Sequence, residues 1–328
     1  MAILLTLEKV KAMTNTKFSS LTKPETIQPF KVSQAVAAIG LAESDDKVLG
    51  YIDFLARQIP IQKAEFLHVL PTFDLFTTLF EKEGKGLVSN YELNEEAIRE
   101  MKKATQERLA KQNIGKVSFD VREGDPLEEL LKEVEETDAD LTIIGQRGAT
   151  SQHGILARNL ARKTTGNALI IPEEAKKTIT RILVPVDFSP SSVKALQIAV
   201  GINRQLKESA EIVCLNVFEM PSVASVYIRK TTEELKQMIK NDRMESFRQF
   251  LRTYAPEDAG RIKTELIENK VGDIGTYIMD YATKIGSDMI IIGAKGHSRV
   301  ERLLLGSVTE RMLSENETIP TLVVKLDE

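Results

Sequence analysis

Short apolar runs alternate along the chain with longer segments that repeat apolar residues at helical spacing. In the C-terminal part, five runs rich in Val, Ile and Leu predict buried strands: 181–186, 211–217, 263–268, 288–292 and 321–325. The segments between them predict helices: 193–203, 232–254, 273–285 and 307–314. Strict alternation of strand and helix predicts a parallel sheet covered on both faces, with right-handed crossovers.

The N-terminal part follows the same plan. Its expected strands are 35–39, 65–70, 116–121, 141–144 and 168–171, and its expected helices are 45–58, 94–112, 126–136 and 159–164. Two pairs of landmarks are each 148 residues apart: the strand ends at Val69 and Val217, and the glycines Gly145 and Gly293. A duplication explains this spacing best.

We therefore predict two doubly wound, Rossmann-like domains in tandem, each with a five-stranded parallel sheet. Residues 31–173 form the first domain and residues 179–328 the second, while residues 1–30 are an N-terminal extension. The charged link around 172–177 is short, which favours two packed domains over flexibly tethered ones.

Composition narrows the classes of function. The net charge of −4 argues against nucleic-acid binding, because that usually requires a basic face. No apolar run is long enough to span a membrane, and no signal core is recognisable, so a cytoplasmic location is expected. The one cysteine, Cys214, lies in an apolar strand and is expected to be buried and inert. Neither histidine nor cysteine residues are spaced as metal ligands, so no metal site is predicted.

Candidate chemistry lies in a glycine-rich stretch near the C-terminus. An apolar strand ends at Gly293, Gly296 follows three residues later, and Gly306 with Ser307 precedes a helical pattern. Glycines let the backbone approach a ligand closely or adopt a positive φ, and the start of a helix attracts anions. This spacing predicts a phosphate-binding loop, although an unliganded strand-to-helix turn is the alternative.

The sequence Val184-Pro185-Val186-Asp187-Phe188-Ser189, the strand end at Val217 and the glycine pattern together resemble the universal stress protein family. The resemblance covers residues 31–328 as a tandem pair and implies an adenine nucleotide α-hydrolase-like fold whose ATP-binding members hold the nucleotide at the strand ends. It implies that Asp187 contacts the adenosine part, with Pro185 and Val186 nearby, and that Val217 lines the adenine. The residues expected around the ribose and phosphates are Gly293, Lys295, Gly296, Gly306, Ser307, Val308 and Thr309. Family members usually dimerise through the last strand, and a tandem chain can make this contact between its own halves; a homodimer of the whole chain stays open.

The first repeat departs from this pattern. Depending on a one-residue gap, Ile39 or Gly40 occupies the place of Asp187, and Arg158 and Asn159 stand ten residues after Gly148 where the second repeat has Gly306 and Ser307. We therefore interpret its nucleotide loop as degenerate. Structural pairing, partner binding or a different small ligand are its remaining roles.

Three functions remain in consideration. The first is a regulatory or stress-protective protein that binds ATP in the second domain, with Mg²⁺ held mainly by the phosphates and water. The second is a nucleotide-independent module that binds protein partners. The third is a slow ATP-hydrolysing or nucleotidyl-transferring enzyme, although the stretch is not a Walker A loop and shows no catalytic base, so no catalytic residue is predicted. His68 is expected to be a buried strand histidine with its hydrogen bonds satisfied. The acidic residues of 128–136 are interpreted as a solvated helix face.

Overall fold

The computed structural model describes residues 26–41, 45–70, 90–109, 114–220, 232–270, 272–296 and 305–326. The strands are β1 (Val32–Ala38), β2 (Ile61–Leu70), β3 (Ile114–Glu123), β4 (Leu141–Gln146), β5 (Asn167–Pro172), β6 (Arg181–Pro185), β7 (Glu211–Glu219), β8 (Lys263–Asn269), β9 (Met289–Gly293) and β10 (Thr321–Val324). The helices are α2 (Asp45–Ala56), α4 (Asn90–Leu109), α5 (Pro126–Glu136), α6 (Gln152–Lys163), α7 (Pro190–Asn203), α8 (Thr232–Tyr254), α9 (Ile274–Ile285) and α10 (Ser307–Glu315).

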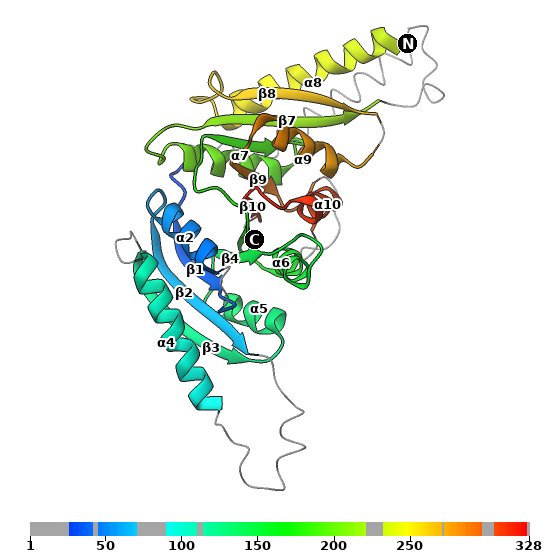
Figure 1. The fold of residues 1–328 in the computed structure, drawn as a ribbon. Coiled ribbons are helices and arrows are strands. Elements are labelled where there is room, and N and C mark those ends of the chain that lie inside the picture. The colour runs from blue at the N-terminus through cyan, green and yellow to red at the C-terminus, as the bar shows by residue number, and fades with distance from the viewer. Residues whose placement is uncertain are drawn as a thin grey trace.

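All the strands join one ten-stranded sheet in the order β3-β2-β1-β4-β5-β10-β9-β6-β7-β8. Within each half the strands are parallel, and the order of the second half mirrors that of the first (Figure 1). The predicted fold class, two Rossmann-like α/β repeats in tandem, is confirmed. The expected helix at 159–164 begins earlier, at Gln152, because Ser151 caps the helix there and accepts a hydrogen bond from the N–H of Gly154.

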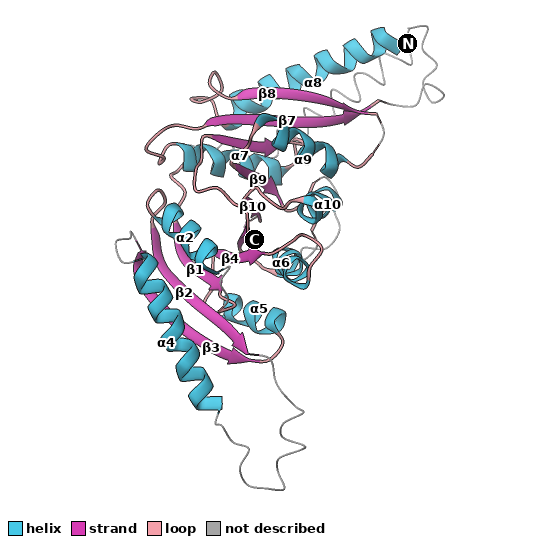
Figure 2. Ribbon diagram, in the orientation of Figure 1, coloured by secondary structure: helices cyan, strands magenta, loops and turns pink. Residues whose placement is uncertain are grey.

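Helices cover both faces of the sheet (Figure 2). One apolar core lies under α2, α4, α7 and α8, and the other lies under α5, α6, α9 and α10. Each core takes residues from both halves, so the halves are packed against each other. Among the helices of the described residues, none combines the length and the apolar character needed to cross a bilayer.

The halves meet at their last strands. β5 and β10 pair antiparallel, with Ala168 opposite Val323 and Ile170 opposite Thr321. Next to this pair, α6 and α10 pack together, and an ion pair joins Arg162 to Glu310. The contact between last strands that the resemblance implies is therefore made inside one chain.

The described end of the N-terminal extension lies against the other half. Ile27 is buried, and its carbonyl oxygen accepts a hydrogen bond of 3.1 Å from the Arg204 guanidinium after α7. The carbonyl of Phe30 accepts one of 3.0 Å from Gln205 Nε2. A Cβ at Gly201 would come within 2.7 Å of the Gln28 carbonyl oxygen, so glycine permits this close packing. Residues 26–30 are thus an arm that the first repeat extends onto the second.

Candidate functional site

The turn after β6 is sharp and presents Asp187 at the carboxyl edge of the sheet. Phe188 has a φ of 63°, which is uncommon for a bulky residue. Its ring packs edge-on against Phe247 and Phe250 of α8, with centroids 5.2 and 5.6 Å away. These contacts stabilise the turn. The Asp187 carboxylate accepts a hydrogen bond of 3.0 Å from the Ser189 N–H, while Ser189, and not Asp187, caps α7.

The end of β7 lies directly beside this turn. The N–H of Val186 donates to the carbonyl of Leu215 at 2.8 Å, and Asn216 Nδ2 donates to the carbonyl of Val186 at 2.7 Å. Pro185, Val186 and Asp187 are therefore brought next to Val217, as predicted. Asn216 was not predicted as a functional residue; a polar side chain in an otherwise apolar strand was the available signal.

The glycines of the predicted loop are required for close approach. A Cβ at Gly293 would come within 2.6 Å of Ser191 Cβ, and a Cβ at Gly296 would come within 2.6 Å of Asp187 Oδ2. None of Gly293, Gly296 and Gly306 has a positive φ, so conformational freedom is not the reason for glycine here. The loop backbone passes over the Asp187 carboxylate, which brings together two sequence positions more than a hundred residues apart.

The start of α10 lies against the end of β9, next to the same loop. The Gly306 N–H donates to the Ala294 carbonyl at 2.7 Å, and Thr309 Oγ1 donates to the Gly293 carbonyl at 3.0 Å. Asp125, Ser151, Ser189 and Asp273 cap α5, α6, α7 and α9 with their side chains, but Gly306 offers no side-chain cap. No cap side chain therefore competes for the first N–H groups of α10, which begins with Ser307, Val308 and Thr309.

Two lysines add positive charge to this region. Lys295 follows the end of β9, and Lys325 follows the end of the neighbouring strand β10. Burial, together with the charge of Lys295, lowers the pKa of Lys325 to about 8. Lys325 Nζ donates to the carbonyl of Arg162 in α6 at 3.1 Å, so this lysine also links the two halves. Two positively charged side chains held close together repel each other, so an anion bound near them is stabilised.

The described part of the site thus gathers all eleven predicted residues where β6, β7 and β9 end. Strand order reverses between β6 and β9, and such a switch point is where open α/β sheets bind ligands. His297 and Arg299, two basic residues between Gly296 and Gly306, lie outside the described residues.

The structure resolves the alignment of the two repeats. Ile39 donates its N–H to Leu67 O as Val186 does to Leu215 O, so Gly40 takes the place of Asp187. Leu41, the next residue, has a φ of 57° like Phe188.

The predicted correspondence of Arg158 with Gly306 is wrong, because the two residues do not occupy equivalent positions in the two halves. The buried positions Ala157, Leu160 and Ala161 of α6 match Thr309, Met312 and Leu313 of α10 at an offset of 152, since 309 − 157 = 152. This offset places Gly154 at Gly306. Sequence spacing missed the match because the loop before α6 is shorter.

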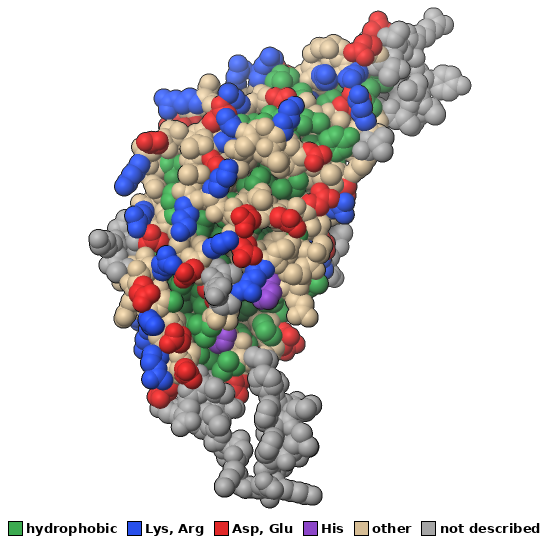
Figure 3. All heavy atoms as spheres, in the orientation of Figure 1, with side chains coloured by type: hydrophobic (Ala, Val, Ile, Leu, Met, Phe, Trp, Pro, Cys, Tyr) green, Lys and Arg blue, Asp and Glu red, His purple; other side chains and the backbone are tan. Residues whose placement is uncertain are grey.

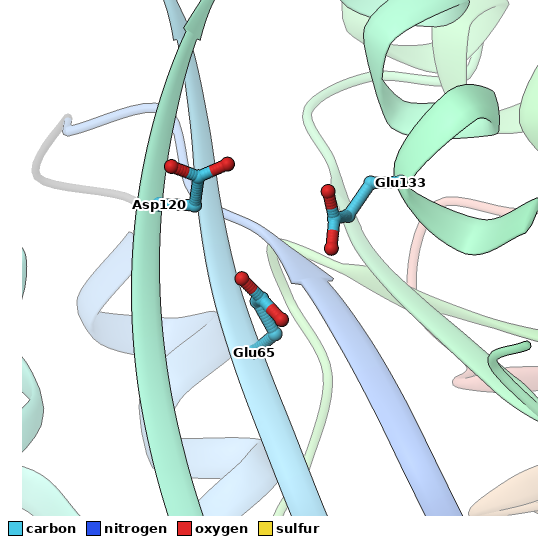
Figure 4. A group of neighbouring side chains, drawn as sticks. All are labelled: Glu65, Asp120 and Glu133. Atoms are coloured by element: carbon cyan, nitrogen blue, oxygen red, sulfur yellow. The ribbon is translucent and has the colours of Figure 1, made fainter. Parts of the chain in front are cut away.

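An acidic cluster lies on the α5 side of the first half (Figure 4). Carboxylate oxygens of Glu65, Asp120 and Glu133 lie within 4.8 Å of one another. Arg122 supplies the cation: it pairs with Glu133, with Glu136 at 2.6 Å and with Asp120 at 3.3 Å. Burial, followed by the charge of Glu65, raises the pKa of Glu133 to about 7. The interpretation of 128–136 as a solvated face is wrong for Glu133, which is 3% exposed.

The structure tests two other predictions. His68 Nδ1 lies 2.7 Å from the carbonyl oxygen of Ile39, so this strand histidine has a hydrogen-bond partner as predicted, but its side chain is half-buried rather than buried. Cys214 is buried, and burial raises the pKa of its thiol, which keeps the thiol protonated and unreactive.

Comparisons with known proteins identify the family. The universal stress protein family matches twice, at residues 33–172 and 178–325, and the chain therefore belongs to this family. A universal stress protein of Methanocaldococcus jannaschii is 30% identical over 145 residues, which cover 44% of this chain and 81% of that protein. A universal stress protein of Synechocystis is 26% identical over 193 residues, covering 57% of this chain and 58% of that protein.

One solved structure shows the same tandem fold. A universal stress protein from Archaeoglobus fulgidus superposes with a TM-score of 0.60 at 18% identity, over 92% of this chain and 99% of that one. Family membership gives the chain a stress-related role.

Proposed function

We propose that this chain binds ATP in its C-terminal half and acts through the bound state as a regulatory, stress-protective protein of the cytoplasm. The observation that carries the proposal is the arrangement where β6 and β9 end. The uncapped start of α10, the close-approach glycines and Lys295 converge there beside Asp187. This combination suits a ligand that joins a polar heterocycle to several negative charges.

Each part has a separate task in the proposed complex. Asp187, Val186 and Val217 hold the adenosine part. The phosphates are held by the remaining predicted residues, Gly293, Lys295, Gly296, Gly306, Ser307, Val308 and Thr309. Magnesium bound with the nucleotide would be held mainly by phosphate oxygens and water. Because the sequence shows no pattern of a catalytic base for a γ-phosphate, the proposed role is binding and signalling, with at most slow hydrolysis.

Calorimetric titration of ATP into the full chain tests the proposal. The Gly306→Arg variant places a long side chain where Ala294 O is 3.3 Å from the new Cβ, in the path of the phosphates. We expect its affinity to fall by about a hundredfold or more, since several charge-assisted contacts are lost. Ile155→Arg is the matched control, because Ile155 of α6 corresponds to Ser307 at the offset of 152 and is 47% exposed. This control should bind ATP like the wild type.

Two results would contradict the proposal. One is an absence of heat and of co-purified nucleotide with the wild type; the other is equal affinity of wild type and Gly306→Arg. If partners then bind with and without ATP alike, the chain is a nucleotide-independent interaction module. Thermal melts of each variant show whether a loss of binding reflects unfolding.

A further inference from the structure

A pocket of about 320 Å³ opens in the N-terminal half at the carboxyl ends of β1, β2 and β4. Its walls are mostly apolar side chains from these strands and from α2, α5 and α6, among them Val48, Leu67, Val69, Leu130, Ile144 and Leu156. Its polar lining includes Asp45, His68, Gln146 and Arg147. Figure 3 shows histidine surface beside exposed hydrophobic surface in this half. The volume is at the lower end of the range for small-molecule sites, roughly 300–1,000 Å³.

This pocket lies at the same place in its half as the proposed ATP site in the other. Gly40, Val69 and Gly145 correspond to Asp187, Val217 and Gly293. His68 corresponds to Asn216, and each side chain contacts the main-chain carbonyl of the strand beside it, Ile39 or Val186, at 2.7 Å. Because a carbonyl oxygen only accepts, His68 Nδ1 carries the hydrogen, and Nε2 of the neutral ring is an acceptor.

A carboxylate lies close to the position that corresponds to Asp187 in the second half. A Cβ at Gly40 would lie 3.7 and 3.8 Å from the two carboxylate oxygens of Asp45, the first residue of α2. The carboxylate of a residue five positions later therefore lies in contact with the place where an aspartate side chain at position 40 would begin. The sequence hides this replacement, since the two aspartates do not align.

The phosphate-binding features are missing. Five residues, 149–153, separate Gly148 from Gly154, whereas nine residues, 297–305, separate Gly296 from Gly306. The Ser151 side chain caps α6, and the Arg158 guanidinium bonds to the carbonyl of Ala149. A Cβ at Gly154 would lie 2.4 Å from that same carbonyl oxygen, so the short loop is packed directly on the helix. The first turn of α6 therefore offers little to a chain of phosphates.

We propose that the pocket binds an unphosphorylated nucleoside, so that one chain holds a nucleoside in its first half and a nucleotide in its second. The nucleotide in the second half is the ATP of the proposed function, and the inference rests on that proposal to this extent. Apolar walls suit the flat face of a base, and the carboxylate of Asp45 and Nε2 of His68 accept hydrogen bonds from ribose hydroxyls or base N–H groups. The carboxylates of Asp45 and Glu173 outnumber the guanidinium of Arg147 at the pocket, which disfavours an anionic ligand.

Equilibrium dialysis of adenosine against the full chain, with and without saturating ATP, tests the proposal. We expect one equivalent of adenosine to stay bound when ATP fills the second half. Asp45→Asn removes the charge, and His68→Asn copies Asn216, keeping a donor to Ile39 O while removing the Nε2 acceptor. Each variant should weaken adenosine binding by about tenfold, the usual size for a lost hydrogen bond to a buried or charged group. Gly306→Arg should leave adenosine binding unchanged.

Several outcomes separate this inference from the proposed function. If ATP fails to bind but adenosine still binds with sensitivity to Asp45→Asn, the inference stands and the proposed function fails. If ATP displaces all adenosine, or if both first-half variants bind adenosine like the wild type, the inference is overturned. Binding of decanoate in place of adenosine would also overturn it, because the pocket would then accept an apolar anion.

Discussion

The sheet face under α5 in the first half and its counterpart under α9 in the second have the same backbone but opposite chemistry. Strand register and the caps Asp125 and Asp273 make Glu65, Arg122 and Glu133 correspond to Val213, Ile267 and Tyr281. The remaining residue of the cluster, Asp120, corresponds to Glu265, so this position is acidic in both halves. Burial, followed by the charge of Glu265, raises the pKa of Tyr281. One backbone thus tolerates either an ionic cluster or an apolar contact.

The nucleotide side differs in the same manner. The second half retains the long loop and an uncapped helix, whereas the first half shortens the loop and caps its helix with Ser151. Differences in side chains and loop length, and not in topology, therefore divide the proposed ligands between the halves.

The largest effect is expected when the ionic cluster of the first half is replaced by the corresponding residues of the second half. Arg122→Ile alone should lower the free energy of unfolding by about 3–5 kcal/mol at pH 8, because it leaves Glu133 buried without its cation. The triple variant Glu65→Val, Arg122→Ile, Glu133→Tyr copies the second half. It should recover to within about 1 kcal/mol of the wild type or exceed it, since well-packed apolar groups often replace buried ion pairs without loss. Urea unfolding of the three proteins measures this; a triple variant as unstable as the single one would show that the two faces are not interchangeable.

A matched pair of glycine substitutions, one in each half, should have the next largest effects, on ATP affinity and on stability. Gly296→Ala directs a Cβ at Asp187 and should weaken ATP binding by about tenfold with little change in stability. Gly148→Ala meets nothing closer than 3.9 Å but holds a φ of 59°, so it should cost about 1 kcal/mol of stability without changing ATP affinity. Calorimetric titration and thermal melts measure both. Equal effects of the two substitutions on ATP binding would contradict the division of ligands.

The smallest expected effect concerns pH. The pKa of Glu133 is about 7 in the folded protein against 4.5 ordinarily, so the folded state binds its proton more tightly. Its contribution to stability is present below pH 4.5 and is lost as the pH rises to about 7. A pKa change from 4.5 to about 7 corresponds to about 3 kcal/mol at most, but glutamine also loses the ion pair with Arg122. Glu133→Gln should therefore be closest to the wild type below pH 4.5 and gain about 1 kcal/mol on it by pH 8. Thermal melts across this range measure the difference; parallel curves for the two proteins would exclude Glu133 as the titrating group.

The sequence by itself determined the fold class, the duplication and most element positions, because apolar periodicity and a repeated glycine pattern reflect local structure and burial. It also identified Pro185 to Asp187, Val217, and the predicted residues at 293–296 and 306–309 as neighbours, since parallel strand ends meet at one edge.

Only the tertiary structure decided which side chains replace one another across the repeat. Asp45 fills the place beside Gly40, Gly154 matches Gly306, and Arg122 neutralises an acidic helix face. Such contacts depend on distances between segments far apart in the chain, and a shift of a few residues in loop length hides them from any comparison by position.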